Sequence, residues 1–206
     1  MAELGRIQKP GVDQFSGKRK LYCVASVYPI EDAPDDYKDL VNKYWDEVVQ
    51  QIEKIETAGR AGKIFCELMS DQSDEDFDLL KRVNERAHQL VRQRLEQGDT
   101  LVPLESKEIA GPYTDWGNCL RVVFTHDVFA KVLQFFMEYS EKRFQHMVTR
   151  IDENLSGGEA GLLIMKDEDR AKLQFPGDVE VFLITPPSYD DIVRWLRENL
   201  GKKKTQ

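Results

Sequence analysis

The sequence predicts an α/β fold: a single three-layer domain in which a mostly parallel sheet is flanked by helices, including one long helix at about 125–155. Two short and almost wholly apolar runs carry this prediction, Gly161–Met165 and Val179–Thr185. Such runs are typical of strands buried on both faces, which usually belong to a sheet covered by helices. Strand-like and helix-like segments alternate along most of the chain, and this alternation favours parallel strands joined by helical crossovers.

Other segments complete the expected sheet. Leu21–Tyr28, Ile64–Met69 and Leu120–Phe124 read as strands because they are short and rich in apolar residues. Thr100–Leu104 contains a proline, which cannot donate to a strand ladder, so this segment is expected to be an edge strand or merely extended.

Four helices are expected from apolar residues at helical spacing. The first begins near Pro34 and closes at Ala58–Gly62. The second begins after the capping Ser73 and ends at Gly98, and the last runs from Ser188 to about Leu200.

The long helix is the fourth of these, and it runs from Thr125 to about Leu155. Its first half is apolar on nearly all sides between Val128 and Phe136, which indicates that other structure covers it. The same helix of a second subunit would provide that cover, so we expect a homodimer through the long helix.

Composition separates the domain from its ends and narrows its surroundings. Residues 1–17 are expected to form a flexible arm, 18–200 the domain, and 201–206 a basic tail. The 37 acidic and 29 basic residues give a net charge of −8, which argues against a dedicated nucleic-acid binder. No stretch is long and apolar enough to span a membrane. Three scattered cysteines without a metal-binding spacing indicate a reducing cytoplasm.

Two residues are candidates for acid–base chemistry. Glu67 lies inside an apolar run near the carboxyl end of a predicted strand, where a crevice would raise its pKa and make it a general base. His126 lies at the expected start of the long helix, where the helix N-terminus would keep its ring neutral. A solvent-facing carboxylate and a surface histidine are the structural alternatives.

The acidic loop after Gly161–Met165 offers candidate metal ligands. Asp167 and Asp169 follow that strand, and carboxylates gathered at one edge of a sheet could hold Mg²⁺. The spacing matches no metal motif, so an ordinary solvated loop is the alternative.

A third candidate site lies in Glu105–Cys119, which fits no period and is expected to be a long irregular segment. Within it, Tyr113, Asp115 and Trp116 combine two aromatic rings with a carboxylate. Such a set could stack on a planar ligand and bond its polar edge, although the tryptophan could equally fix the loop to the core.

These features favour a cytoplasmic binding, regulatory or protein-interaction module whose ligand is not identified. A small metal-assisted hydrolase with an acidic site at the carboxyl ends of the strands is one alternative. A sensor of a planar small molecule or nucleotide is the other. The sequence does not decide whether the protein is an enzyme.

Overall fold

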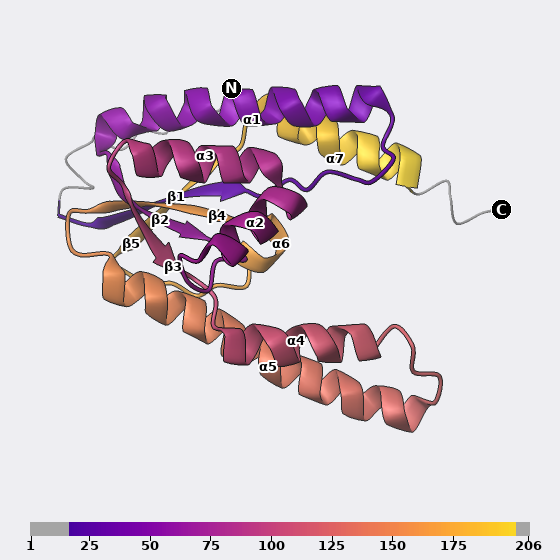
Figure 1. The fold of residues 1–206 in the computed structure, drawn as a ribbon. Helices are drawn as coiled ribbons and strands as arrows, with labels where there is room; N and C mark the ends of the chain where they lie inside the picture. The colour runs from indigo at the N-terminus through magenta and orange to yellow at the C-terminus, as the bar shows by residue number, and fades with distance from the viewer. Residues whose placement is uncertain (1–16, 201–206) are drawn as a thin grey trace, which may run out of the picture.

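The predicted fold class is confirmed by a computed structural model that describes residues 17–200 (Figure 1). Five strands form one sheet in the order β3-β2-β4-β1-β5, and every neighbouring pair is parallel. Residues 1–16 of the predicted arm and the basic tail at 201–206 lie outside the described residues. The strands are β1 Arg19–Ala25, β2 Ala61–Cys66, β3 Thr100–Pro103, β4 Ala160–Met165 and β5 Val179–Ile184.

Helices cover both faces of the sheet. The helices are α1 Asp35–Ile55, α2 Asp74–Val83, α3 Glu85–Glu96, α4 Lys107–Cys119, α5 His126–Asn154, α6 Asp167–Arg170 and α7 Pro187–Leu200, with the 3-10 turn η2 Glu56–Ala58 after α1. On one face α1, α2, α3 and α7 build the larger core, whereas on the other face α5 builds the smaller one. Figure 1 shows α1, α3 and α7 above the sheet and α5 below it.

The two apolar runs differ in how far they are buried. Every residue of β4 is buried at the centre of the sheet, as predicted for Gly161–Met165. The prediction that Val179–Thr185 is buried on both faces is wrong, because β5 pairs only with β1 and forms an edge. Val181 and Leu183 are in register with Leu21 and Cys23 on the side of the sheet where α5 packs, yet at this edge they remain 37% and 50% exposed.

The first two strands end earlier than the apolar runs that predicted them. β1 ends at Ala25 and β2 at Cys66. Tyr28 and Glu67 therefore lie beyond the carboxyl ends of their strands, at the edge of the sheet where ligands of α/β proteins bind. The edge position expected for Thr100–Leu104 is confirmed, because β3 closes the other side of the sheet.

The single helix predicted from Ser73 to Gly98 is two helices, α2 and α3, which meet at Asn84. The backbone of Asn84 leaves the helical region, and its side-chain oxygen accepts a hydrogen bond from the Ala87 amide at 3.1 Å. Its side-chain nitrogen donates to the Val27 carbonyl at 3.0 Å. Asn84 thus begins a new helix and also ties it to the chain beyond β1.

The irregular loop predicted at Glu105–Cys119 is largely a helix, α4, even though it contains Pro112 and two internal glycines. Packing on α5 explains the difference, because Tyr113 and Trp116 stack on phenylalanines of α5. A Cβ at Gly117 would lie 3.3 Å from Phe136, so this glycine lets the two helices approach closely. The strand predicted at Leu120–Phe124 is also wrong: this segment is the turn between α4 and α5.

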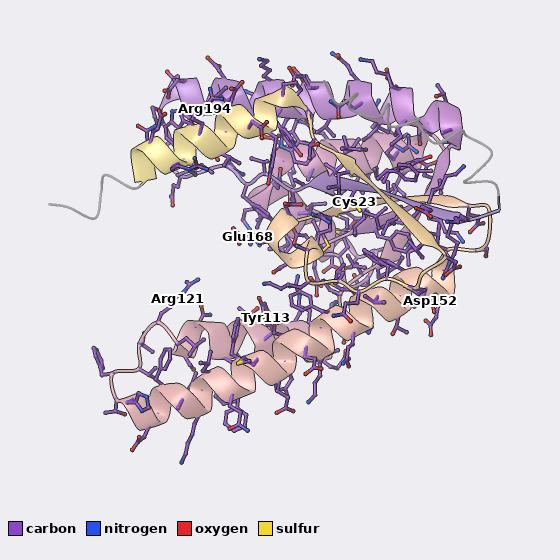
Figure 2. All side chains as sticks on the ribbon, turned by 180° about the vertical axis from the view of Figure 1, so that it is seen from behind. Cys23, Tyr113, Arg121, Asp152, Glu168 and Arg194 are labelled. Atoms are coloured by element: carbon purple, nitrogen blue, oxygen red, sulfur yellow. The ribbon has the colours of Figure 1, made fainter. Side chains whose placement is uncertain are left out.

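The expected long helix is confirmed as α5. Its second half packs on the sheet, whereas its first half and α4 form a hairpin that projects away from the sheet (Figure 1). Figure 2 shows Arg121 near the free end of this hairpin and Tyr113 closer to the sheet. Within the described part of the chain, no helix is long and apolar enough to cross a membrane.

The chain leaves neighbouring strands β2 and β4 in opposite directions. After β2 it passes through α2 and α3 on the larger-core face to reach β3. After β4 it passes through α6 and Leu173, which packs in the smaller core, to reach β5. A crevice forms between two strands whose connections diverge in this way, and such a crevice is the usual ligand site of an open α/β sheet.

Candidate functional site

A cavity of about 560 Å³ lies at this point of divergence. We call it the carboxyl-edge cavity. Its walls come from the segments that follow β1, β2, β3 and β4, together with α4 and the middle of α5. It is lined by Tyr28, Glu67, Leu68, Ser70, Asp76, Leu79, Glu105, Lys107, Ala110, Gly111, Tyr113, Thr114, Asp115, Arg143, Lys166 and Asp169.

Glu67 is the most unusual group in this cavity, because it carries an ionisable carboxyl group and yet the residue is only 2% exposed. Its Oε1 accepts hydrogen bonds from the Tyr28 hydroxyl at 2.6 Å and from the Lys166 backbone amide at 2.9 Å. Among the described residues no donor bonds its Oε2, which stays accessible from the cavity. Glu67 therefore presents one free acceptor atom to a ligand.

Burial also changes the acidity of Glu67. Removal from water raises its pKa from an ordinary value of 4.5 to about 7, although the Tyr28 hydrogen bond and the nearby Lys166 charge act in the opposite direction. Near neutral pH the carboxyl group can therefore either accept or donate a proton.

The backbone around Glu67 explains why the carboxylate is held there. The Glu67 amide donates to the Ile164 carbonyl at 3.0 Å, which extends the pairing of β2 with β4 by one residue. The next residue, Leu68, has a positive φ of 72°. A side-chain-bearing residue rarely adopts this conformation, and such strain is concentrated at functional sites. The chain thus turns sharply immediately after the carboxylate.

A buried ion-pair network forms a second wall of the cavity. The Arg143 Nε donates to Glu105 Oε2 at 3.0 Å, and its Nη1 donates to Asp169 Oδ2 at 3.1 Å. Burial alone would lower the pKa of Arg143, but the two carboxylates raise it above its usual value, so the guanidinium stays charged. Arg143 therefore links α5 to the segments after β3 and β4.

Residues of α4 and the residue after β4 also line the cavity. Tyr113 stacks on Phe136 with a centroid distance of 5.1 Å, and the guanidinium of Arg143 lies 5.0 Å from its ring centre. The Lys166 ammonium lies 4.7 Å from the ring centre of Tyr28. These cation–aromatic contacts help to fix Arg143 against Tyr113 and Lys166 against Tyr28 in the cavity wall.

The predicted site residues are only partly brought together. Glu67, Tyr113, Asp115 and Asp169 line the carboxyl-edge cavity. The sequence assigns Glu67 and Asp169 to one site, the acidic site at the strand ends, and Tyr113 and Asp115 to a separate planar-ligand site. Asp167 does not line this cavity but a neighbouring one at the same edge of the sheet. Its Oδ1 accepts a hydrogen bond from Arg170 Nε at 2.8 Å.

The other two predicted residues lie away from the cavity. Trp116 stacks on Phe135 at 4.7 Å and is not part of the cavity wall. His126 lies at the free end of the hairpin with its side chain 93% exposed, next to Asp127. The predicted clasp of Tyr113 and Trp116 around one ligand is therefore not formed.

The residues offered as metal ligands are paired with cations. Asp169 bonds Arg143 on one side and Lys172 on the other, and Asp167 bonds Arg170. Within residues 17–200 no three histidine, cysteine or carboxylate side chains are grouped closely enough to hold a metal ion.

Several cavity residues were not singled out as candidates from the sequence. Glu105 and Lys166 each lie just beyond a strand, as Glu67 does, so their position could have identified them. Tyr28 was placed within a strand that ends three residues earlier. Nothing in the sequence indicates that Arg143 reaches the cavity, because a charged residue among the polar positions of a helix usually faces solvent.

Comparison with known proteins adds no relative: no family model, no curated protein and no solved structure matches this chain.

Proposed function

We propose that this protein is a regulatory binding module that takes a small polar molecule into the carboxyl-edge cavity. The observation that carries the proposal is the free Oε2 of the buried Glu67. Because Oε2 faces the cavity and no protein donor bonds it, a ligand that carries an N–H or O–H group can donate a hydrogen bond to it there. Pockets with a few convergent polar groups are typical of small-molecule sites.

The charges of the cavity favour a ligand that donates hydrogen bonds. Five acidic side chains line it, against the three basic ones of Lys107, Arg143 and Lys166. Two of those cations are already paired, Arg143 as described and Lys107 with Asp71 at 2.6 Å. Amines, amides, amidines and the N–H edges of nucleobases fit this lining better than an anionic phosphate does.

A planar ligand remains an alternative, with Tyr113 and Asp115 as its contacts and without Trp116. Tyr113 and Asp115 both line the cavity and could bond the edge of a planar molecule. Stacking between Tyr113 and Trp116 is not part of the proposal, because each ring already stacks on a phenylalanine of α5.

An enzyme is the second candidate function, and one observation favours it. A carboxyl group with a pKa of about 7 in a cavity is suited to general acid–base catalysis. Glu67 also contacts the first residue of the acidic loop through the Lys166 amide. The metal-assisted form has less support, because cations already neutralise Asp167 and Asp169.

Self-association through the long helix and a cytoplasmic location complete the proposal. Exposed apolar side chains on the first half of α5 support the homodimer. All three cysteines are free thiols, which supports a reducing compartment. Because Tyr113 of α4 belongs both to the hairpin and to the cavity wall, a bound ligand would contact the element that mediates association.

A thermal-shift screen tests the binding proposal. Amines, amino acids, nucleosides, nucleotides, Mg²⁺ and Mn²⁺ are added to the wild-type protein, to Glu67→Gln and to the exposed control Glu96→Gln. A ligand at a hundredfold excess over its Kd stabilises the native state by about 2.7 kcal/mol. We expect a shift in wild type and control that is reduced in Glu67→Gln. Equal shifts in all three proteins would place the ligand elsewhere, and turnover of the ligand would favour the enzyme.

A further inference from the structure

The projecting hairpin holds most of the exposed apolar surface. Of the nine large apolar residues that are exposed in the described chain, six lie between residues 122 and 137. They are Val122, Phe124, Val128, Phe129, Phe135 and Met137. No residue of α4 is buried, and before Arg143 only Val132 of α5 is buried. A hairpin that buries so little lacks a core of its own, and such a surface marks an interaction site.

One face of α5 has the spacing of a helix–helix interface. Val128, Lys131, Phe135, Glu138 and Lys142 follow one another at intervals of three, four, three and four residues. This is the heptad spacing that keeps side chains on one stripe of a helix that packs on another. All five are exposed, with Val128 and Phe135 at 48% and 43%. We call them the α5 stripe.

The charges on this side of α5 alternate in a self-complementary order. Asp127, Lys131, Glu138 and Lys142 are negative, positive, negative and positive, and they are separated by four, seven and four residues. When a second α5 helix lies antiparallel to the first and the midpoints of the two series coincide, each acidic residue of one helix lies opposite a basic residue of the other at all four positions. In a parallel arrangement in register, each charge would meet its own copy. The series therefore selects an antiparallel second copy.

We propose that two copies of the protein associate through antiparallel α5 stripes, with a two-fold axis passing between Gln134 and Phe135. In this register Lys131 faces Glu138 of the partner subunit, and Asp127 faces Lys142 of the partner subunit. The two-fold axis repeats each pair, as an isologous interface requires. The Phe135 rings lie next to the axis, and Trp116, which stacks on Phe135, extends the apolar surface onto α4.

Together the two hairpins form a four-helix arrangement in which exposed apolar side chains gain cover. Glu138 already pairs with Lys142 within the subunit at 2.6 Å, so the partner's lysine would join an existing pair rather than desolvate a lone carboxylate. This inference rests on the proposed self-association and specifies its partner, orientation and register. It does not depend on the ligand of the carboxyl-edge cavity.

Charge reversal with rescue tests the register. Sedimentation equilibrium of the full chain measures the dimer dissociation constant of wild type, Lys131→Glu, Glu138→Lys and the double variant. Each single reversal places like charges together at two symmetric positions, so we expect dimer dissociation constants raised roughly tenfold. The double variant restores opposite charges at both positions and should regain most of the wild-type affinity. Glu153→Lys, outside the paired segment, is the control and should leave the affinity unchanged.

The possible outcomes distinguish failure of the proposed register from failure of the proposed self-association. Wild type that remains monomeric up to high micromolar concentration would overturn both the self-association and its register. A wild-type dimer that tolerates both single reversals would overturn the register while self-association stands. Weakening in both single variants without recovery in the double variant would also contradict the pairing. Circular dichroism spectra of the variants check that the helices remain formed.

Discussion

Replacement of Glu67 by glutamine should change how stability depends on pH. In the native protein, burial raises the Glu67 pKa to about 7 from an ordinary value of 4.5 that the unfolded chain retains. Between these two values the native state binds more protons than the unfolded state, so stability falls as the pH rises. A difference of about 2.5 pKa units corresponds to about 3 kcal/mol. Glutamine cannot ionise and keeps an oxygen to accept the Tyr28 and Lys166 hydrogen bonds.

The measurement is urea unfolding followed by tryptophan fluorescence, for wild type and Glu67→Gln, between about pH 5 and about pH 8. Near the lower limit the two proteins should have similar free energies of unfolding. Near the upper limit the variant should be more stable than wild type by up to about 3 kcal/mol. Parallel pH profiles would refute the reasoning, because they would mean that Glu67 titrates alike in the native and unfolded states. Glu96→Gln, at an exposed position, controls for the loss of one negative charge.

Two further predictions concern packing and the ion-pair network. Arg143→Met leaves the buried Glu105 carboxylate without its cation, so the free energy of unfolding should fall by about 3–5 kcal/mol in urea titrations. Adding Glu105→Gln to that variant should recover part of the loss, and no recovery would contradict the assigned pairing. Gly161→Ala places a Cβ 2.8 Å from the Phe65 ring in the centre of the sheet, so it should destabilise by about 1–3 kcal/mol. Gly62→Ala is the matched control, since nothing lies within 4 Å of its Cβ, and an equal loss there would refute the steric explanation.

The sequence was sufficient to predict the fold class, because helical and strand periods alternate along the chain. The sequence predicts the burial of the last strand less well. Glu180 interrupts its apolar run, and this interruption indicates the alternating burial of an edge strand rather than burial on both faces. An apolar run shows that side chains avoid water on average, but it does not show whether a helix covers both faces. That depends on where α5 lies, which is a property of the whole fold.

The helix α4 illustrates the same limit. Gly111, Pro112 and Gly117 each disfavour a helix when considered locally. In the structure, stacking on α5 outweighs those preferences, and Gly117 even permits the close approach. Local propensity is a weak guide wherever tertiary packing supplies more free energy than the propensities cost.

The candidate site was partly predictable for a topological reason. Glu67 was identified because the carboxyl ends of parallel strands meet at one edge, and this argument needs no side-chain detail. His126 is a candidate because it lies at the expected start of the long helix, but α4 and α5 place it at the far end of the hairpin. Arg143 reaches the cavity from the middle of a helix, and only the packing of α5 reveals that.

Crystallographic screening of small polar fragments tests the central claim most directly. Crystals of the protein are soaked with individual amines, amides and heterocycles, and density in the carboxyl-edge cavity is examined for each. The account predicts that bound fragments gather in this cavity with an N–H or O–H group within hydrogen-bond distance of Glu67 Oε2. Fragments that bind only at other places, with this cavity left unoccupied throughout the library, would contradict it.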